Sequence, residues 1–422
     1  MLEEIIIKNL LSFKNEVCLS FEATNETMAE EQFVVTMPDG KRILRFALIY
    51  GANASGKTNV LTALQGLRTF CLNEPKNIDQ TTGVVPFRFD VSTPNDPTEF
   101  SLKFYADGKR YHYLLRMNIQ KILEEKLSYY ESNRPTMLFH RKEENERLQL
   151  FVNSAVNKLN DVELQQLQIN CLDNMSFFAV RGKLNIALRG IDTARDWLQK
   201  HVMNMISPSL SMFEYAKKKV EGNPALVPYL LGKMHTSDFN ITGMQTERRP
   251  ENMPVEVIQG IRGDNDLSEE DKKELLTKLQ TNFEHTVVNK RGEEKYSLED
   301  EFESRGTKRV LGIETAIYEA RNKKALMLID EIESSLHPAL VEKVIYDFLS
   351  NKDETQMLVT THYDPLLDLI GDLLRKDTVW FTEKGQDGVT SLYSLADFAG
   401  LNKLSSLQRA YRGGRFGAIP NI

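Results

Sequence analysis

The stretch that decides the fold is Gly51-Ala52-Asn53-Ala54-Ser55-Gly56-Lys57-Thr58, a complete G-x-x-x-x-G-K-T pattern. An apolar run from Ile43 to Tyr50 precedes it and is expected to form a strand. Apolar residues then recur at helical spacing, at Val60, Leu61, Leu64 and Leu67. A buried strand, a glycine-rich turn and a helix opening at Lys57 are the setting of a phosphate-binding P-loop, or Walker A motif. The sequence therefore predicts nucleotide binding.

Each part of this motif has an expected role. Backbone N–H groups between Gly51 and Gly56 form an anion nest at a helix N-terminus, where phosphates bind. Lys57 is expected to neutralise the β- and γ-phosphates, and the Thr58 hydroxyl to ligate Mg²⁺. We expect the contacts with ATP to extend from Gly51 to Asn59.

A second motif supplies the acids that hydrolysis needs. The apolar run Ala325–Ile329 predicts a buried strand and ends at Asp330-Glu331, a Walker B pattern. Asp330 is expected to hold Mg²⁺, and Glu331 to act as the general base on the attacking water. Another apolar strand, Gln356 to Val359, is followed by His362. The predicted catalytic residues are therefore Lys57, Glu331 and His362.

The distance between the two motifs sets the organisation. Lys57 and Asp330 are 273 positions apart, so a large insertion separates two halves of one nucleotide domain. We predict an N-terminal half over 1–150, an insertion over 151–300 and a C-terminal half over 301–422. The first half is expected to contain strands, with a hairpin turn at Asp107-Gly108. The insertion is expected to be mostly helical, with one helix capped by Ser268 in an acidic stretch.

These residues resemble the stand-alone, SMC-like branch of ABC-type ATPases, often called "AAA family ATPase" and related to OLD and RecF-type heads. The resemblance rests on several segments, namely Ile7–Asn15, Asp330-Glu331-Ile332-Glu333, Ser335-Leu336-His337-Pro338, Thr360-Thr361-His362 and Gly414–Pro420. Ile7–Asn15 is similar to the family's opening beside the nucleotide, and Asp330–Glu333 to its D-E-x-E Walker B. Ser335–Pro338 is similar to its D-loop and Thr360–His362 to its H-switch. Gly414–Pro420 is similar to the G-R-Y-G-A-I-P tail of a subgroup paired with RloB-type proteins. The resemblance implies an α/β fold, an ABC-type P-loop NTPase head whose mixed sheet has flanking helices.

In such heads, a signature motif contacts the γ-phosphate bound to a partner subunit. The best match here is Glu303-Ser304-Arg305-Gly306, just before a predicted helix. The resemblance implies that Ser304 and Gly306 contact ATP across a dimer or higher oligomer, and that the imidazole of His362 contacts the γ-phosphate. Because the segment keeps only the serine and one glycine of L-S-G-G-Q, Ser304 could instead be a simple helix cap. No Q-loop glutamine can be assigned.

Bulk composition excludes several classes of protein. The 422 residues are 41% hydrophobic and 27% charged, as in globular proteins, and the formal net charge is −7. This charge argues against coating of nucleic acid by bulk electrostatics. No apolar run is long enough for a membrane span, and Glu3 and Glu4 stand where a secretory signal would be basic. Three scattered cysteines suggest neither zinc nor disulfides, so we expect a cytoplasmic protein.

The C-terminal tail has the opposite charge from the whole. Residues 401–422 contain Lys403, Arg409, Arg412 and Arg415 and no acid. This segment could contact nucleic acid or an acidic partner, or it could dock on its own domain with its charges solvated.

The resemblance implies an ATP-driven switch in bacterial defence against phage, working with a separately encoded effector such as an RloB/Toprim-type nuclease. Toprim chemistry needs a D-x-D pair, and after Walker B this chain has none, so any nuclease would act in trans. A contact with DNA or with a phage protein is also expected among its partners. The alternative is a RecF/SMC-like DNA-maintenance ATPase that clamps DNA. An SMC arm is disfavoured because residues 155–300 show no sustained heptads, and a transporter motor because L-S-G-G-Q is incomplete.

Overall fold

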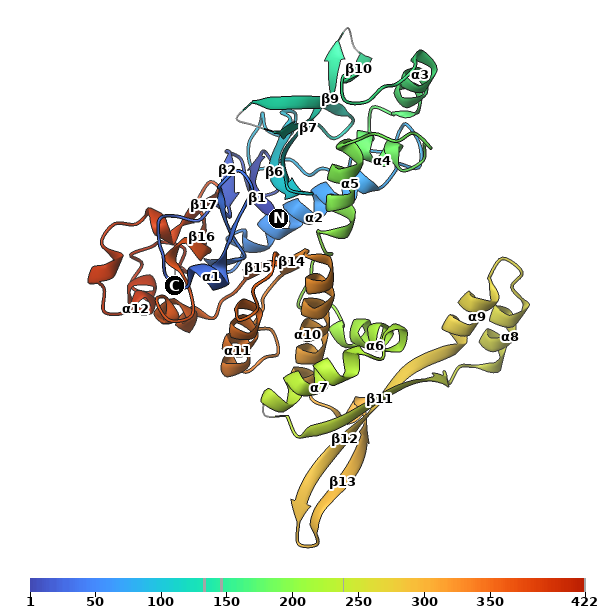
Figure 1. The fold of residues 1–422 in the computed structure, drawn as a ribbon, viewed down its shortest axis with the longest axis vertical. Helices are drawn as coiled ribbons and strands as arrows, with labels where there is room; N and C mark the ends of the chain where they lie inside the picture. Colours follow the sequence, from blue (N-terminus) through green and yellow to red (C-terminus); the bar gives the residue numbers. More distant parts are fainter. Residues whose placement is uncertain (132–133, 145–146, 238, 421–422) are drawn as a thin grey trace. The chain divides into compact units, whose positions relative to one another are not determined.

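The computed structural model describes residues 1–131, 134–144, 147–237 and 239–420, and they form two compact units (Figure 1). The first unit comprises Met1–Pro208, Ala320–Glu333 and Ile345–Ile422, and the second comprises Ser209–Glu319 and Ser334–Val344. Residues 151–208, which the sequence places in the insertion, therefore pack with the first unit. No helix in the described part of the chain combines the length and apolar character that crossing a bilayer requires.

A seven-stranded antiparallel sheet forms one part of the first unit, in the order β10-β9-β8-β7-β6-β1-β2. The predicted hairpin is confirmed, because Ala106 pairs with Lys109 across Asp107 and Gly108, which have φ values of 47° and 72°. The bounds are β1 Leu2–Lys8, β2 Val17–Ser20, β6 Thr98–Ala106, β7 Lys109–Met117, β8 Ile122–Tyr130, β9 Pro135–Glu144 and β10 Arg147–Val152.

A five-stranded sheet, in the order β14-β15-β5-β16-β17, carries the nucleotide motifs. Strands β14, β15, β5 and β16 are parallel and β17 is antiparallel, so the predicted mixed sheet is confirmed. The bounds are β5 Phe46–Gly51, β14 Leu326–Ile329, β15 Gln356–Thr360, β16 Val379–Lys384 and β17 Thr390–Ser394. β5, β14 and β15 are buried at every position, as is expected for strands covered on both faces.

The apolar run before the P-loop is divided in two. β4 (Arg42–Leu44) pairs with β3 (Val34–Thr36), and β5 begins only at Phe46. The intervening Arg45 is buried, and its guanidinium lies 2.8 Å from the Asp353 carboxylate. A buried charge with a specific partner thus marks the boundary that an apolar run alone does not reveal.

The helix after the P-loop, α2 (Lys57–Leu72), buries Val60, Leu61, Leu64 and Leu67, as predicted. After α5, residues 202–206 extend along β14 through parallel bridges from Val202 to Leu326 and from Ile206 to Ile329. The other helices and single 3-10 turns of this unit are α1 Glu30–Phe33, α3 Asp161–Asn170, α4 Phe177–Arg181, α5 Ile191–Lys200, α12 Leu407–Arg412, η2 Asp364–Leu369, η3 Lys376–Thr378, η4 Leu395–Asp397 and η5 Leu401–Lys403.

The second unit combines helices with a three-stranded sheet that the sequence did not predict. Its bounds are α6 Met212–Gly222, α7 Leu226–Thr236, α8 Val255–Gly263, α9 Glu269–Leu276, β11 Ile241–Pro250, β12 Thr277–Asn289, β13 Gly292–Glu299 and η1 Asp300–Phe302. Phe283 of β12 packs in a core with Phe213, Leu230, Val310 and Leu311. The predicted cap of α9 is confirmed, because Ser268 accepts a hydrogen bond from the Asp271 N–H in a capping box.

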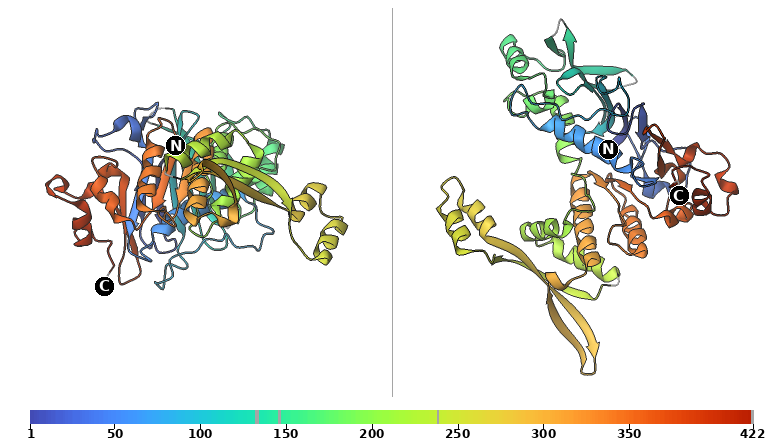
Figure 2. Two further views of the ribbon diagram at one scale, coloured as in Figure 1. Left: turned by 90° about the horizontal axis from the view of Figure 1, so that it is seen from below. Right: turned by 180° about the vertical axis from the view of Figure 1, so that it is seen from behind.

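β12 is the longest element of this sheet and is shared between two partners. Its first part pairs with β11 and its last part with β13. The α8–α9 pair and the β12–β13 hairpin therefore lie at opposite ends of the sheet, as Figure 2 shows from two sides. Two longer helices follow in the chain: α10 (Arg305–Lys323), which matches the helix predicted at the Ser304 segment, and α11 (Pro338–Leu349).

The C-terminal tail docks on its own domain. Tyr411 stacks on Phe381, and its hydroxyl donates to the Ala418 carbonyl. Arg412 makes a bidentate ion pair with Asp364, and Arg415 donates to the Ala399 carbonyl at 3.4 Å, so at least two of the four tail cations have partners within the chain. The side chains of Lys403, Arg409 and Arg415 are exposed, and their contact with nucleic acid or an acidic partner stays a prediction.

Candidate functional site

The P-loop leaves β5 at Gly51 and enters α2 at Lys57, and its two glycines are needed for close packing. A Cβ on Gly51 would lie 2.5 Å from Thr382 Oγ1 and 2.6 Å from the Thr382 carbonyl oxygen. Gly56 has φ 108°, and a Cβ there would lie 2.8 Å from Thr390 Oγ1. Larger residues would therefore push the loop away from the strands behind it. Asn53 and Ala54, at the tip of the loop, are exposed.

Lys57 is buried at the start of α2, and its Nζ donates to the carbonyls of Gly51 and Ala52, at 2.9 and 3.0 Å. Burial lowers the pKa of Lys57 to about 8, and the nearby carboxylates of Asp330 and Glu331 offset only part of that effect. A desolvated ammonium without a carboxylate in direct contact is ready to pair with an anion such as a phosphate.

The Walker A and Walker B motifs meet at Thr58 and Asp330. Thr58 Oγ1 lies 3.0 and 3.1 Å from the two carboxylate oxygens of Asp330. The backbone N–H of Asp330 donates to the Ile206 carbonyl, so the extra edge segment at 202–206 holds the end of β14. The structure thus brings together the hydroxyl and the carboxylate that the sequence predicts as Mg²⁺ ligands.

Both of these groups present oxygen atoms, which are the ligands that Mg²⁺ prefers. Asp330 Oδ1 already accepts from Thr360, whereas Oδ2 has only the Thr58 hydroxyl as a partner in the described hydrogen bonds. No group of three or more His, Cys, Asp or Glu residues in the described ranges could hold a metal ion. A Mg²⁺ ion on Thr58 and Asp330 would take its remaining ligands from phosphates and water, as is usual for this ion.

Thr360, at the end of β15, fixes the Walker B acids and was not predicted. Its buried hydroxyl donates to Asp330 Oδ1 at 2.7 Å and accepts from the Glu331 N–H at 2.9 Å. Glu331 has φ 49°, a left-handed conformation that is uncommon outside glycine and often marks functional sites. The hydrogen bond from Thr360 helps to hold Glu331 in that conformation.

His362 and Glu333 complete the acidic end of the site. The Glu333 carboxylate accepts a hydrogen bond from the backbone N–H of His362 at 2.6 Å and another from the Thr361 hydroxyl at 2.7 Å. Desolvation of the imidazole lowers the pKa of His362 below 6.5, and the positive charge of Lys57 lowers it further. His362 is therefore close enough to Lys57 to sense its charge, and its imidazole is neutral at pH 7.

The N-terminal opening lies beside the P-loop. Ser12 Oγ accepts from Asn59 Nδ2 at 2.7 Å and from Thr390 Oγ1 at 2.8 Å. Thr390 also reaches the Ser55 carbonyl, and Thr382 Oγ1 lies 2.7 Å from Ser55 Oγ. Sequence reasoning missed these threonines because a single Thr in a strand carries no motif. Their positions become visible only in the sheet order: Thr382 lies on β16, which pairs with β5 opposite Gly51, and Thr390 lies on the next strand, β17.

Ser304 and Gly306 belong to the second unit. Ser304 Oγ accepts from the Thr307 N–H at 3.0 Å, so Ser304 caps α10, which was the alternative interpretation of this residue. Gly306 lies in the first turn of the helix without a positive φ. A Cβ there would first meet the Ser335 carbonyl oxygen, at 3.3 Å. A side chain at this position would therefore require the backbone at Ser335 to shift slightly, so local packing itself favours a glycine here.

Solved structures and protein families were compared with the chain. The SMC head domain from Thermotoga maritima is 12% identical, and the match covers 93% of this chain and 98% of that chain with a TM-score of 0.39. An SmcHead bound to the C-winged helix domain of ScpA is 16% identical, and the match covers 97% of this chain and 99% of that chain with a TM-score of 0.38. An Smc head with an extended coiled coil bound to the C-terminal domain of ScpA derived from Pyrococcus furiosus is 13% identical, and the match covers 98% of both chains with a TM-score of 0.39. With TM-scores below 0.5, we draw nothing from these three similarities.

No curated protein is significantly similar to the chain. A family model described as "AAA domain, putative AbiEii toxin, Type IV TA system" matches residues 46–163 and 200–368, which is more than half of the chain. Those ranges include the P-loop, the Walker B acids and His362. The P-loop that joins β5 to α2, the Walker B pair after β14 and the sequence match agree, and the chain belongs to this family of AAA-domain proteins.

Proposed function

We propose that the chain is a cytoplasmic, ATP-hydrolysing molecular switch. The observation that carries the proposal is the contact of Thr58 Oγ1 with the Asp330 carboxylate, at 3.0 and 3.1 Å, with Glu331 as the next residue. Enzymes that transfer a phosphoryl group to water hold Mg²⁺ with such a hydroxyl and carboxylate, next to a P-loop lysine that binds the phosphates.

Each residue then has a role in hydrolysis. Bound Mg²⁺ would neutralise phosphate charge. Lys57 would release its hydrogen bonds to the carbonyls of Gly51 and Ala52 and donate to phosphate oxygens instead. The remaining P-loop residues would supply backbone N–H donors. Glu331 would accept a proton from the attacking water, and the neutral imidazole of His362 would bind near the γ-phosphate.

We further propose that Ser304 and Gly306 contact ATP bound to a second copy of the chain. The hydroxyl of Ser304 and the first turn of α10 present donors at a helix N-terminus, where anions bind favourably. The glycine, which has no side chain, would allow a phosphate to approach the backbone closely. ATP would then hold two copies together, and its hydrolysis would release them.

Hydrolysis by the purified chain with Mg²⁺ tests the first proposal. Lys57→Ala is expected to lose ATP binding, and Glu331→Gln to bind ATP but lose turnover by at least about 100-fold, as for removal of a general base. Gly66→Ala is a matched control, because a Cβ added at Gly66 in α2 would meet nothing within 4 Å. Hydrolysis at the unchanged rate in both active-site variants would refute the assignment.

We propose that the switch serves in defence against phage and controls a separate effector, such as an RloB/Toprim-type nuclease. The family description, a putative toxin of a type IV toxin–antitoxin system, and the tail that resembles an RloB-paired subgroup support this role. Co-purification with the product of the neighbouring gene is the expected result. Cleavage of DNA by the purified chain alone in Mg²⁺ would contradict an effector that acts in trans.

The exposed cations Lys403, Arg409 and Arg415 support a second candidate, a DNA clamp of the RecF/SMC kind. Tight binding of duplex DNA that needs ATP but no partner protein would favour this function. Replacement of the three cations by alanine should then weaken the binding and reduce its salt dependence.

A further inference from the structure

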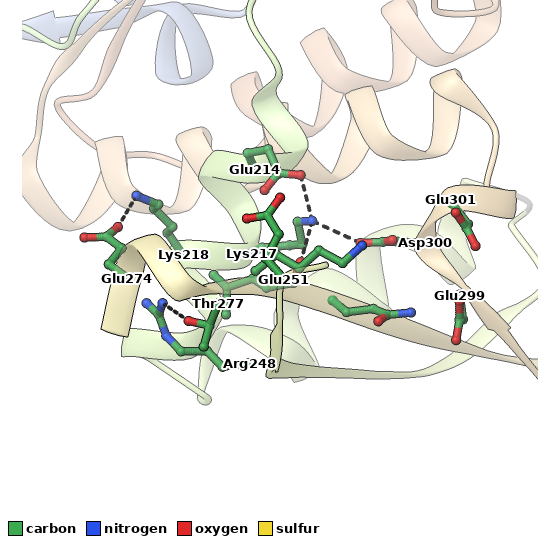
Figure 3. Close-up of a pocket in the computed structure, with 13 residues that line it drawn as sticks. Glu214, Lys217, Lys218, Arg248, Glu251, Glu274, Thr277, Glu299, Asp300 and Glu301 are labelled. Carbon is green, nitrogen blue, oxygen red and sulfur yellow. Dashed lines mark hydrogen bonds and ion pairs between the residues drawn. The ribbon is translucent and has the colours of Figure 1, made fainter. Parts of the chain in front are cut away.

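Segment 300–303, which leads into α10, is fastened to β12 at both ends. At the first end, the buried Lys217 of α6 donates to the Leu279 carbonyl of β12 at 2.8 Å and lies 3.1 Å from Asp300 Oδ2 (Figure 3). Glu214 lies 2.7 Å from the same ammonium. Asp300 Oδ2 also accepts from the Thr281 N–H at 3.3 Å.

At the second end, His285 of β12 holds the residue that precedes Ser304. His285 Nε2 and Glu303 Oε1 are 2.6 Å apart, and the two side chains are only 17% and 9% exposed. Because Glu303 is covalently bonded to Ser304, the position of β12 is transmitted to the first turn of α10 without an intervening flexible link.

Polar contacts of this kind fix geometry more than they stabilise a fold. Removing an ammonium and a carboxylate from water costs much of what their attraction returns, and apolar side chains of similar size would pack as well. A partly buried hydrogen-bonded pair does, however, define one arrangement of its two elements. The contacts at Lys217 and His285 thus determine where Ser304 and Gly306 lie relative to β12.

The Lys217 contact is not packed on all sides. Lys217, Asp300 and Glu251 line a cavity of about 550 Å³ together with residues of α6, β11 and β12 (Figure 3). Segment 300–303 therefore has free space beside it, into which it could move if the contact with Lys217 were broken.

We propose that Lys217 and His285 are positioning residues for the hydrolysis reaction: they hold Ser304 and Gly306 in the arrangement that engages ATP on a second copy of the chain. The inference rests on the proposed contact of these two residues with ATP across copies. In this proposal, β12 is the element through which the insertion controls turnover. α9 lies at one end of β12, and the hairpin with β13 lies at the other.

The first experiment separates binding from turnover. His285→Ala and Lys217→Met are expected to keep the affinity for ATP within about two-fold, because the P-loop is untouched, and to lower kcat at least about ten-fold. Lys217→Arg, which retains the charge and donors, should recover part of the rate. Lys295→Met is the control: Lys295 lies on β13 with a side chain 62% exposed and is not bonded to segment 300–303.

The second experiment uses mixtures of variants. In a mixed pair of His285→Ala and Glu331→Gln chains, one site combines an intact Walker face with an intact Ser304 segment from the other chain. Two poorly active proteins should therefore recover roughly half of the wild-type rate per mixed pair, as one of its two sites is complete. Glu303→Ala should behave as His285→Ala does, which keeps the test decisive if either variant is unstable.

Ser304→Ala mixed with Glu331→Gln distinguishes the two levels of the proposal. Recovery with Ser304→Ala, together with a wild-type kcat for His285→Ala and Glu303→Ala, would overturn the positioning role alone. An absence of recovery with Ser304→Ala would overturn the contact between copies and the positioning role with it. A loss of ATP affinity in His285→Ala that equals the loss of kcat would also contradict the inference.

Discussion

At the scale of single residues, the phosphate-binding and acidic positions are readable from the sequence because each belongs to a contiguous motif. Lys57, Thr58, Asp330 and Glu331 have the partners that these motifs require. Thr360 does not have this advantage. Its role depends on the pairing of β15 with β14, which places its hydroxyl between Asp330 and the Glu331 N–H.

Thr360→Val tests that role, because valine keeps the shape and removes the hydroxyl. We expect kcat to fall about ten-fold or more as Glu331 leaves its left-handed conformation, with ATP affinity little changed. The lost hydrogen bond to Asp330 and the Glu331 N–H left without its acceptor should also cost about 1–3 kcal/mol of unfolding free energy. Thr360→Ser should restore both quantities. Wild-type turnover by Thr360→Val, measured in steady state, would remove Thr360 from the site.

Lys57 predicts a pH dependence of nucleotide affinity. Burial lowers its pKa to about 8, below the ordinary value of 10.5, so the free protein loses this charge as the pH rises through 8. Phosphate should bind the charged form. The affinity for ATP should therefore be constant below about pH 8 and fall by up to about ten-fold per pH unit above it. Binding titrations between about pH 7 and 9.5 measure this, with an unchanged affinity across the range contradicting the assignment.

At the scale of elements, the strongly patterned segments of the nucleotide domain are predictable and the insertion is only partly so. β5, β14 and β15 are uninterrupted apolar runs, and α2 has a clear helical stripe. β12 has only Leu279, Thr281 and Phe283 buried in its first part, too few apolar residues to signal a strand. β12 pairs with β11, and even the closest partners in sequence, Pro250 and Thr277, are 27 residues apart. Local sequence pattern does not encode such a long-range contact.

The first turn of α10 supplies a prediction at this scale. Gly306→Ala should preserve the fold, because the helix preference of alanine, worth up to about 1 kcal/mol, offsets the small shift required of the Ser335 carbonyl. We nevertheless expect kcat to fall about ten-fold, since the added methyl would meet the phosphate of a second copy. Gly260→Ala in α8, where nothing lies near the new methyl, is the control and should keep its rate. Equal rates for both variants would show that Gly306 has no role in catalysis.

At the scale of the whole molecule, the chain folds as two units, one with the nucleotide motifs and one with the Ser304–Gly306 segment. Family membership establishes an AAA domain, whereas ATP hydrolysis and the assembly into ATP-bridged copies are our proposals. A sequence alone does not reveal such an assembly, because the contacts that form it join different chains. Its signature is a dependence of the oligomeric state on ATP.

The most direct measurement is the mass of the Glu331→Gln chain in solution with and without Mg²⁺ and ATP, at concentrations where the wild-type chain is studied. A protomer has a mass of 48.4 kDa. We predict that ATP shifts Glu331→Gln to a stable dimer or higher oligomer, and that Ser304→Ala in the same background or Lys57→Ala prevents the shift. A mass that does not change when ATP binds to Glu331→Gln would contradict the account.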